Sequence, residues 1–403
     1  MVPKGWGNFM LSEICSKQIS YGIVQTGDNL PKGIPCLRVI DLTKDYISLD
    51  DMIKTSLEIH QAYKKTILEE GDIVLALRGE VGLAHLIDES LSGINITRGL
   101  ARIAADKNKI VPEFLLWALR STKFRTDLMR RVGGSALQEI SLSELRKVEA
   151  LVPPLSEQKK IAKILSTWDK AITITEQLLS NSQQQKKALM QQLLTGKKRL
   201  EGFNQAWSTF KVSEMGSIFS GGTPDTTEKE YWNGNISWLT PTDVTSLKSR
   251  YVFSTNKTIS EKGLKNSSAK KLPKGALLIC TRATIGSMAI STTEITTNQG
   301  FKNLVPNSNF SVDFLYYLFN FNVKELVRKS SGSTFLELSK SDFEKLTFLC
   351  PCLDEQQKIA SVLIVVDNQI AVQQQKISYL KQEKKALIQQ LLTGKRRVKT
   401  DAA

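Results

Sequence analysis

One stretch of about fifty residues occurs twice in this 403-residue chain, and this duplication limits the possible folds more than any other feature. Residues 153–200 and 351–398 align without gaps, and 25 of the 48 aligned residues are identical. Both copies begin with P-x-L-x-E-Q-x-K-I-A and contain K-K-A-L-x-Q-Q-L-L-T-G-K near their end. The chain is therefore expected to alternate variable domains with repeated segments. The predicted boundaries are 1–152, 153–200, 201–350 and 351–400.

The repeated segments have the sequence period of paired helices. Ten positions in each segment, from Ile161 to Leu193 and from Ile359 to Leu391, are spaced alternately four and three residues apart, and most are apolar. A single short stripe of this kind favours a helix packed on its own domain, whereas two sustained copies favour pairing of the two helices. Since the first helix runs directly into the second variable domain, we expect an antiparallel pair with internal pseudo-twofold symmetry.

Capping residues mark the expected ends of these helices. Ser156 and Asp354 come just before the periodic runs, where a side-chain oxygen accepts the free backbone N–H groups of the first turn. Gly196 and Gly394 follow the runs, where a left-handed residue commonly ends a helix. Each repeated segment is therefore predicted to form one long helix.

The variable domains are predicted to contain both strands and helices. Apolar runs at 73–77 and 276–280 are bounded by glycine and turn residues, as β-strands often are. Residues 112–120 and 312–319 are typical of helices. The expected fold class is mixed α/β (α+β), with two variable domains separated by two long helices that form an antiparallel coiled coil.

The formal charge of +15 makes a polyanion the first partner to consider, with nucleic acid ahead of an acidic membrane surface. Ten of the fifteen excess charges lie on residues 153–200 and 351–403, whereas residues 1–152 carry only +1. Specific contacts are therefore expected from local loops. The sequence has neither a membrane-spanning apolar stretch nor the apolar region of a signal peptide, so a cytoplasmic protein is expected.

No cofactor or metal site is predicted in this chain. The five cysteines form no C-x-x-C pair, and His60 and His85 have no partner pattern. The phosphate-binding motif G-x-x-x-x-G-K-[ST] is absent. Pro153-Pro154 lacks the polar and aromatic neighbours of an amino-methyltransferase motif, and the carboxylates near Asp225 have the wrong spacing for a nuclease metal site. The chain is therefore expected to be non-catalytic.

The candidate DNA-binding residues occupy corresponding positions in the two variable domains. Arg78 and Arg282 each follow a predicted strand and lie four residues before a glycine. An arginine in such a turn can bind guanine or a phosphate, although an ordinary exposed salt bridge is an equally valid interpretation. Arg98 and Gln299 form a second corresponding pair, each followed by glycine, and a glutamine suits adenine.

Two loops rich in small residues add Thr223 and Ser333 to the candidates. Thr223 lies in the loop Ser220-Gly221-Gly222-Thr223-Pro224, and Gly332-Ser333 corresponds to the other loop, Gly133-Gly134-Ser135. Small residues and free backbone N–H groups allow close approach to a phosphate backbone. A plain turn is at least as probable an interpretation of each loop.

The whole chain resembles the specificity (S) subunit of type I restriction–modification enzymes. The resemblance rests on the two alternating variable domains and on the two motifs of the repeated segments. It implies that each variable domain is a target-recognition domain that reads one half of a split, asymmetric target on double-stranded DNA. It also implies that the helices set the gap between the halves.

The same resemblance implies several partner subunits. The helices would dock two methyltransferase (M) subunits, and restriction (R) subunits would join them, so that S-adenosylmethionine, ATP and Mg²⁺ are expected in the partners. The partner-binding residues are expected near the C-terminal end of each helix. They are Lys186, Leu189, Leu193, Lys384, Leu387 and Leu391. For Lys186 and Lys384, which share one seam position, extension of the charged end to solvent is an equally valid interpretation. Two other functions remain as alternatives, a self-contained DNA-modifying enzyme and a coiled-coil adaptor that binds only proteins.

Overall fold

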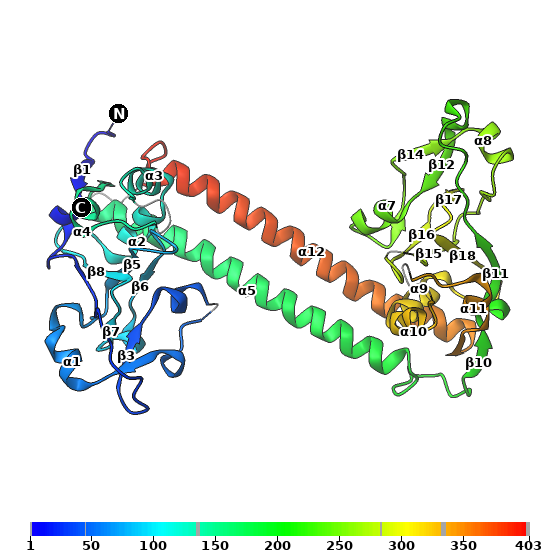
Figure 1. Cartoon of the computed structure of the whole chain (residues 1–403), viewed down its shortest axis with the longest axis horizontal. Helices are drawn as coiled ribbons and strands as arrows, with labels where there is room; N and C mark the ends of the chain where they lie inside the picture. Colours follow the sequence, from blue (N-terminus) through cyan, green and yellow to red (C-terminus); the bar gives the residue numbers. More distant parts are fainter. Residues whose placement is uncertain (1, 45, 134–137, 283, 332–335, 400–403) are drawn as a thin grey trace. The chain divides into compact units, whose positions relative to one another are not determined.

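The chain forms two compact units, and each unit contains one of the variable domains. A computed structural model describes residues 2–44, 46–133, 138–282, 284–331 and 336–399. The first unit combines residues 1–176 with 375–403, and the second consists of residues 177–374. Two helices of 39 residues each, α5 (Leu155–Leu193) and α12 (Leu353–Leu391), therefore contribute to both units (Figure 1).

Two small sheets and one strand pair organise the variable domain of the first unit. The strand orders are β2-β8-β5-β6 and β4-β3-β7, and β1 pairs with β9. The strands are β1 (Gly7–Met10), β2 (Ser20–Tyr21), β3 (Ile34–Leu37), β4 (Ile53–Thr55), β5 (Asp72–Ala76), β6 (Ala84–Leu86), β7 (Asn95–Ile96), β8 (Leu100–Ala104) and β9 (Glu149–Val152). The helices are α1 (Leu57–Ala62), α2 (Pro112–Arg120), α3 (Thr122–Arg130) and α4 (Leu142–Lys147), with short 3₁₀ turns η1 (Leu11–Ile14), η2 (Val39–Thr43), η3 (Leu49–Asp51), η4 (Lys64–Thr66) and η5 (Glu89–Leu91).

The variable domain of the second unit is organised in the same way. Its strand orders are β11-β18-β15-β16-β13 and β14-β12-β17, and β10 pairs with β19. The strands are β10 (Ser208–Lys211), β11 (Gly216–Ser220), β12 (Trp232–Leu239), β13 (Tyr251–Val252), β14 (Lys257–Ile259), β15 (Leu277–Cys280), β16 (Met288–Ser291), β17 (Thr296–Thr297), β18 (Phe301–Pro306) and β19 (Thr347–Cys350). The helices are α6 (Val212–Met215), α7 (Pro241–Ser246), α8 (Glu261–Lys265), α9 (Val312–Phe321), α10 (Val323–Arg328) and α11 (Lys340–Lys345), with the 3₁₀ turn η6 (Lys229–Tyr231).

The pairing of the central strands shows that the two variable domains share one architecture. In each domain a fully buried strand, β5 or β15, pairs antiparallel with a neighbour on either side. In each domain the three-stranded sheet also contains one parallel pair, β3–β7 or β12–β17. The predicted strands at 73–77 and 276–280 correspond to β5 and β15, and the predicted helices correspond to α2 and α9. The mixed fold class is confirmed.

Ion pairs show that α5 and α12 lie antiparallel within each unit. In the first unit Asp169 pairs with Lys384, and Glu176, further along α5, pairs with Lys381, which comes earlier in α12. The Glu176–Lys381 pair measures 2.7 Å. In the second unit Lys186 of α5 is 2.6 Å from Asp367 of α12. The predicted antiparallel pairing is therefore confirmed.

The apolar seam predicted from the spacing is also confirmed. All ten seam positions between Ile161 and Leu193, and all ten between Ile359 and Leu391, are buried or half-buried. The seam includes the hydroxyls of Thr175 and Ser182, which are both 5% exposed. Thr175 Oγ1 donates to the backbone oxygen of Ala171 at 2.7 Å, so this hydroxyl is satisfied within its own helix. In the described residues no helix has the length and apolarity needed to cross a membrane.

The helices start two residues earlier than the predicted caps imply, whereas the ends are as predicted. Ser156 and Asp354 are inside the first turns of α5 and α12 and are not their caps. A glutamine holds each start instead, because Gln158 Nε2 donates to the Pro153 oxygen at 2.7 Å and the second helix repeats this bond. The glycines that follow the helices have left-handed φ angles of 68° and 67°.

A carboxylate in the first turn of each helix is paired with an arginine that lies beyond the end of the other helix. In the first unit Arg397 binds Glu157 through two nitrogens, with Nε 2.9 Å from Oε2. In the second unit Arg199 binds Glu355 with both distances at 2.7 Å. The side chains of Glu157 and Glu355 are only 7% and 1% exposed. Each unit is thus closed by a residue that is distant in sequence.

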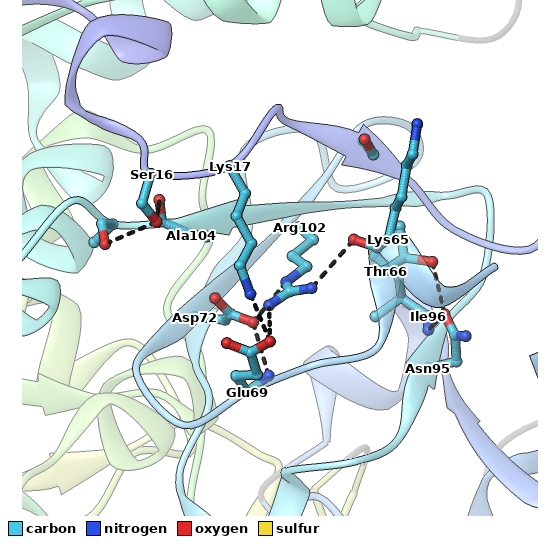
Figure 2. Close-up of polar contacts among 12 residues, drawn as sticks. Ser16, Lys17, Lys65, Thr66, Glu69, Asp72, Asn95, Ile96, Arg102 and Ala104 are labelled. Carbon is cyan, nitrogen blue, oxygen red and sulfur yellow. Dashed lines mark hydrogen bonds and ion pairs between the residues drawn. The ribbon is translucent and has the colours of Figure 1, made fainter. Parts of the chain in front are cut away.

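Figure 2 shows a second buried ion pair, which lies inside the first unit. The side chains of Arg102 on β8 and Asp72 on β5 are 4% and 5% exposed, and Nε lies 2.6 Å from Oδ2. The guanidinium also donates to the backbone oxygen of Lys65 at 3.2 Å and lies 3.2 Å from Glu69, which pairs with exposed Lys17. Burial raises the pKa of Asp72, although Arg102 favours its charged form.

We expect Asp72→Asn to destabilise the first unit by about 3–5 kcal/mol, because Arg102 would lose its buried counter-charge and keep only the exposed Glu69. Lys17→Gln, at the exposed end of the same cluster, should cost less than about 1 kcal/mol. Urea unfolding with hydrogen exchange of the β5 amides would measure both losses. Equal losses of unfolding free energy in the two variants would contradict the conclusion that burial makes the Arg102–Asp72 pair the more important one.

Candidate nucleic-acid interface

A hollow of about 670 Å³ in the first unit brings together two residues predicted from the sequence. Arg78, in the turn after β5, and Arg98, in the turn between β7 and β8, both line it. The absence of a side chain at Gly99 allows this approach, because a Cβ there would lie 2.9 Å from Val39 and 3.4 Å from Arg78 Nε. In the part of the chain that the structure describes, neither arginine takes part in an ion pair.

A third arginine in this hollow, Arg38, was missed by the sequence reasoning. Its Nε and Nη2 donate to the two oxygens of Asp41 at 2.9 and 2.8 Å, and Nη2 also donates to the backbone oxygen of Asp51 at 3.0 Å. Burial alone would raise the pKa of Asp41, but the bonds from Arg38 lower it, so the carboxylate stays charged. Arg38 is thus a preorganised donor. The only signal in the sequence is an aspartate three residues later.

The hollow also has an apolar side. Ile40 and Val24, which both line it, are 61% and 45% exposed. Guanidinium groups bind guanine or phosphate, and apolar side chains pack on the methyl group of thymine. Among the described residues no group of histidine, cysteine or carboxylate side chains could hold a metal ion. The arrangement is suited to recognition of a base edge or a phosphate.

The corresponding arginine of the second unit is paired. Arg282 Nη2 lies 2.7 Å from Glu337 Oε2, and Lys302 Nζ lies 3.6 Å from Oε1 of the same carboxylate. The bond from Arg282 lowers the pKa of Glu337, so that this carboxylate is charged. Glu337 faces Arg282 in a β-bridge, as Glu139 faces Arg78 in the first unit. Arg282, 44% exposed, would meet a ligand with its charge partly neutralised.

Thr223 and Gln299, both predicted as DNA-binding residues, are bonded to each other. Thr223 Oγ1 donates to Gln299 Oε1. Two glycines allow this contact: a Cβ at Gly221 would lie 1.9 Å from the backbone oxygen just before Gln299, and one at Gly222 would lie 2.3 Å from the nitrogen of Ala269. The close approach predicted for this loop is therefore made to the chain's own backbone.

The two units place their arginines in equivalent surroundings. A Cβ built at Gly300 would lie 3.9 Å from Arg282 Cβ, just as one at Gly99 would touch Arg78. Arg282, Gln299 and Thr223 therefore lie in one region of the second unit. Ser333 lies outside the described residues. DNA binding by these side chains stays a prediction.

The leucines predicted to bind a partner pack on their own units. Leu193 and Leu391 are each 2% exposed and belong to the hydrophobic cores of the second and first units. Leu189 and Leu387 pack against the same two cores and are partly buried. Their apolar character is thus explained within the chain. Docking of a partner on these residues stays a prediction.

The two seam lysines attach the helix pair to the variable domains. Lys384 bonds to Asp169, and its Nζ lies 4.7 Å from the ring centroid of Trp117 on α2. Lys186 bonds to Asp367, and its Nζ lies 5.8 Å from the ring centroid of Tyr317 on α9. Each lysine combines an ion pair with a cation–π contact. This arrangement accounts for a charged residue at the same seam position in both helices.

Comparison with known proteins gives one consistent result. The model of the family described as "Type I restriction modification DNA specificity domain" matches residues 3–181 and again residues 204–382. The MjaIX specificity subunit of Methanocaldococcus jannaschii is 40% identical over 41% of this chain, and the match covers only 38% of that relative. The putative MjaX specificity subunit of the same organism is 26% identical over 99% of this chain and 95% of its own length.

Solved structures show the same fold along nearly the whole chain. The S subunit from M. genitalium matches with a TM-score of 0.61 at 15% identity and covers 97% of this chain and 96% of its own. The HsdS subunit from Thermoanaerobacter tengcongensis matches with a TM-score of 0.53 at 19% identity and covers 98% of both chains. The resemblance predicted from the repeated segments is confirmed.

We expect Lys384→Glu to destabilise the first unit by about 1–2 kcal/mol, because it removes a cation–π contact and faces Asp169 with a like charge. The double variant Asp169→Lys/Lys384→Glu should recover part of this loss. Lys385→Glu, at the exposed neighbouring position, is the matched control. Thermal unfolding of the three variants measures the coupling. If the double variant were less stable than Lys384→Glu, the proposed role of this ion pair would be wrong.

Proposed function

Because the chain belongs to the type I restriction–modification DNA specificity family, we propose that it is the sequence-reading subunit of a type I restriction–modification complex. Each variable domain then reads one half of a bipartite, asymmetric target on double-stranded DNA. The family and its named relatives are specificity subunits. The prediction that the chain is a specificity subunit, and not itself a modifying enzyme, is confirmed at this level.

The observation that carries the proposal is a shared backbone frame with different side chains. The frame consists of an arginine after the central strand, a glycine turn beside it and a glutamate in a β-bridge opposite it. On this frame the first unit presents Arg98 and Arg38, and the second presents Gln299 and Thr223. Arginine suits guanine and glutamine suits adenine, so the two half-sites should differ in sequence.

The long helices are proposed to set the gap between the half-sites. A helix pair with a continuous buried seam is stiff, and a fixed separation between two DNA-reading elements determines the spacing of their half-sites. Seven residues added to a helix lengthen it by about 10 Å. This length corresponds to the rise of roughly three base pairs of duplex.

The partners follow from the same proposal. The chemistry of modification and cleavage would come from methyltransferase (M) and restriction (R) subunits docked on this chain. S-adenosylmethionine, ATP and Mg²⁺ would then be bound by those subunits. One of the solved structures with this fold is described as showing assembly of the type I R-M system, which supports a multi-subunit complex. We propose two methyltransferase subunits, one for each repeated segment.

Replacing residues 1–152 with the corresponding domain of another specificity subunit tests the central proposal. We expect the host's methylated motif to change in one half and to keep its other half and its gap. Single-molecule sequencing of host DNA, with and without the exchange, reads both halves at once. A motif changed in both halves would show that the two domains do not read separately.

Single arginine substitutions test the base contacts. Arg78→Ala should weaken binding of target DNA by about 1–3 kcal/mol and relax the requirement at one position of the first half-site. Arg282→Ala should have the corresponding effect only in the second half-site. Competition binding with targets altered one base pair at a time measures both. Unchanged methylation and binding in either variant would reject base reading by that arginine.

A further inference from the structure

The positive charge of the first variable domain is concentrated on one short helix. Residues 120–131, which include α3, contain five basic residues and one acidic residue, a net charge of +4. The whole of residues 1–152 carries only +1, so the remainder of the domain is acidic. This weakly charged domain therefore has, besides the hollow that contains Arg78 and Arg98, a second local site at which a polyanion would be attracted.

Two arginines on the outer face of α3 have no counter-charge. Phe124 and Leu128 bury the inner face in the core, whereas Arg125 and Arg130 are exposed. The acidic residue of the helix, Asp127, pairs with Arg131 at 3.3 Å. Within the described ranges, Arg125 and Arg130 are in no ion pair.

The exposed face of α3 is hollowed, and five of the six residues that line the hollow carry a guanidinium or hydroxyl group. The hollow has a volume of about 550 Å³ and is lined by Arg120, Thr122, Arg125, Thr126, Met129 and Arg130. Arg120 is held in place, since its Nη2 donates to the backbone oxygen of Ala84 at 3.1 Å and its guanidinium lies 5.4 Å from the ring centroid of Trp117. Three guanidinium groups and two hydroxyl groups around one hollow form a set of donors suited to phosphate oxygens.

The end of α3 adjoins the loop that follows Arg78. Gly82 in this loop has a left-handed φ of 83°, and a Cβ there would lie 2.6 Å from Leu128 Cδ2. Val81 and Leu128 belong to the same buried cluster. The helix that carries the unpaired arginines therefore packs against the loop that follows Arg78, a candidate base-reading residue.

We propose that the exposed face of α3 binds the phosphate backbone of the DNA beside the half-site read by the first domain. The proposal rests on the proposed function, because it assumes that this domain binds DNA. Arg125 and Arg130 are five residues apart, which corresponds to about 7.5 Å along the helix axis, roughly the rise of two base pairs, so the two side chains can reach separate phosphates. Such contacts position the domain on the duplex and do not read sequence.

The corresponding helix of the second unit is chemically different. In α10, which follows α9 as α3 follows α2, Arg328 pairs with Glu325 of its own helix at 2.6 Å. A carboxylate on this surface repels phosphate and neutralises the arginine. Arg328 is therefore less available to a phosphate than Arg125 and Arg130, whereas Lys324 and Lys329 are exposed on and beside α10.

The double variant Arg125→Gln/Arg130→Gln tests the proposal, with Arg328→Gln as a control for loss of a paired charge. The full-length chain, in the complex isolated from its host, is titrated with target DNA and with DNA scrambled in the first half-site, at several salt concentrations. We expect the slope of log K against log salt to fall by about 1.8 in magnitude, since each phosphate contact contributes about 0.9. The ratio of affinities for the two DNAs should stay the same, and the control should keep the wild-type slope.

Each other outcome has a distinct meaning. An unchanged slope in the double variant, with target preference retained, would overturn the role of α3. A lower ratio of target to scrambled affinity would assign Arg125 and Arg130 to base reading instead. Loss of a co-purifying subunit with an unchanged slope would assign the α3 face to a protein partner. If the wild-type complex itself showed no preference for the target, the proposed function would fail independently of α3.

Discussion

Pairing of a buried glutamate with a distant arginine is the interaction on which both compact units depend. Glu157 and Glu355 lie in the first turns of the long helices and are almost completely buried. Leaving either carboxylate without its counter-charge would cost several kcal/mol. Arg397 and Arg199 supply the counter-charges from just beyond the helix ends, after the left-handed glycines have turned the chain.

A tryptophan near the start of each variable domain contacts the arginine of the same buried ion pair. The guanidinium of Arg397 lies 5.7 Å from the ring centroid of Trp6, and that of Arg199 lies 5.6 Å from the centroid of Trp207. Each unit therefore joins three separate parts of the sequence: a domain start, the beginning of one helix and the end of the other. The close conservation of residues between the two repeated segments has a physical basis in this requirement, because both copies make the same contacts.

The parts of the fold that follow from local periodicity could be predicted from the sequence, and the parts that depend on long-range contacts could not. The seam and the closing glycines were predictable because spacing and backbone conformation are local properties. Ser156 was expected to cap α5, but Gln158 holds the helix start through the backbone of Pro153, and the periodicity gave no sign of this bond. The Arg102–Asp72 pair joins residues 30 positions apart on adjacent strands, and no sequence period connects them.

The candidate DNA-binding residues show the same difference between features that are local in sequence and features that depend on long-range contacts. Arg78 and Arg98 could be proposed because each occupies a turn that recurs in the second domain. Arg38 could not, because it is held partly by a backbone oxygen of Asp51 that only the fold brings near. The repeated arrangement of turns can therefore be predicted from the sequence alone. Whether an arginine in such a turn is free or ion-paired can be seen only in the structure. Glu337 illustrates the difference, since it changes Arg282 from a free cation to half of an ion pair.

The division of the chain into units has a consequence for the order in which the protein is made. The first unit includes residues 375–403, whereas the second is complete at residue 374. All residues of the second unit are therefore synthesised before residues 375–403, which complete the first unit. The first unit cannot be completed without residues 375–403, because Leu391 belongs to its core and Arg397 pairs with its buried Glu157. Of these two units, the one whose synthesis begins earlier is therefore the later to be completed.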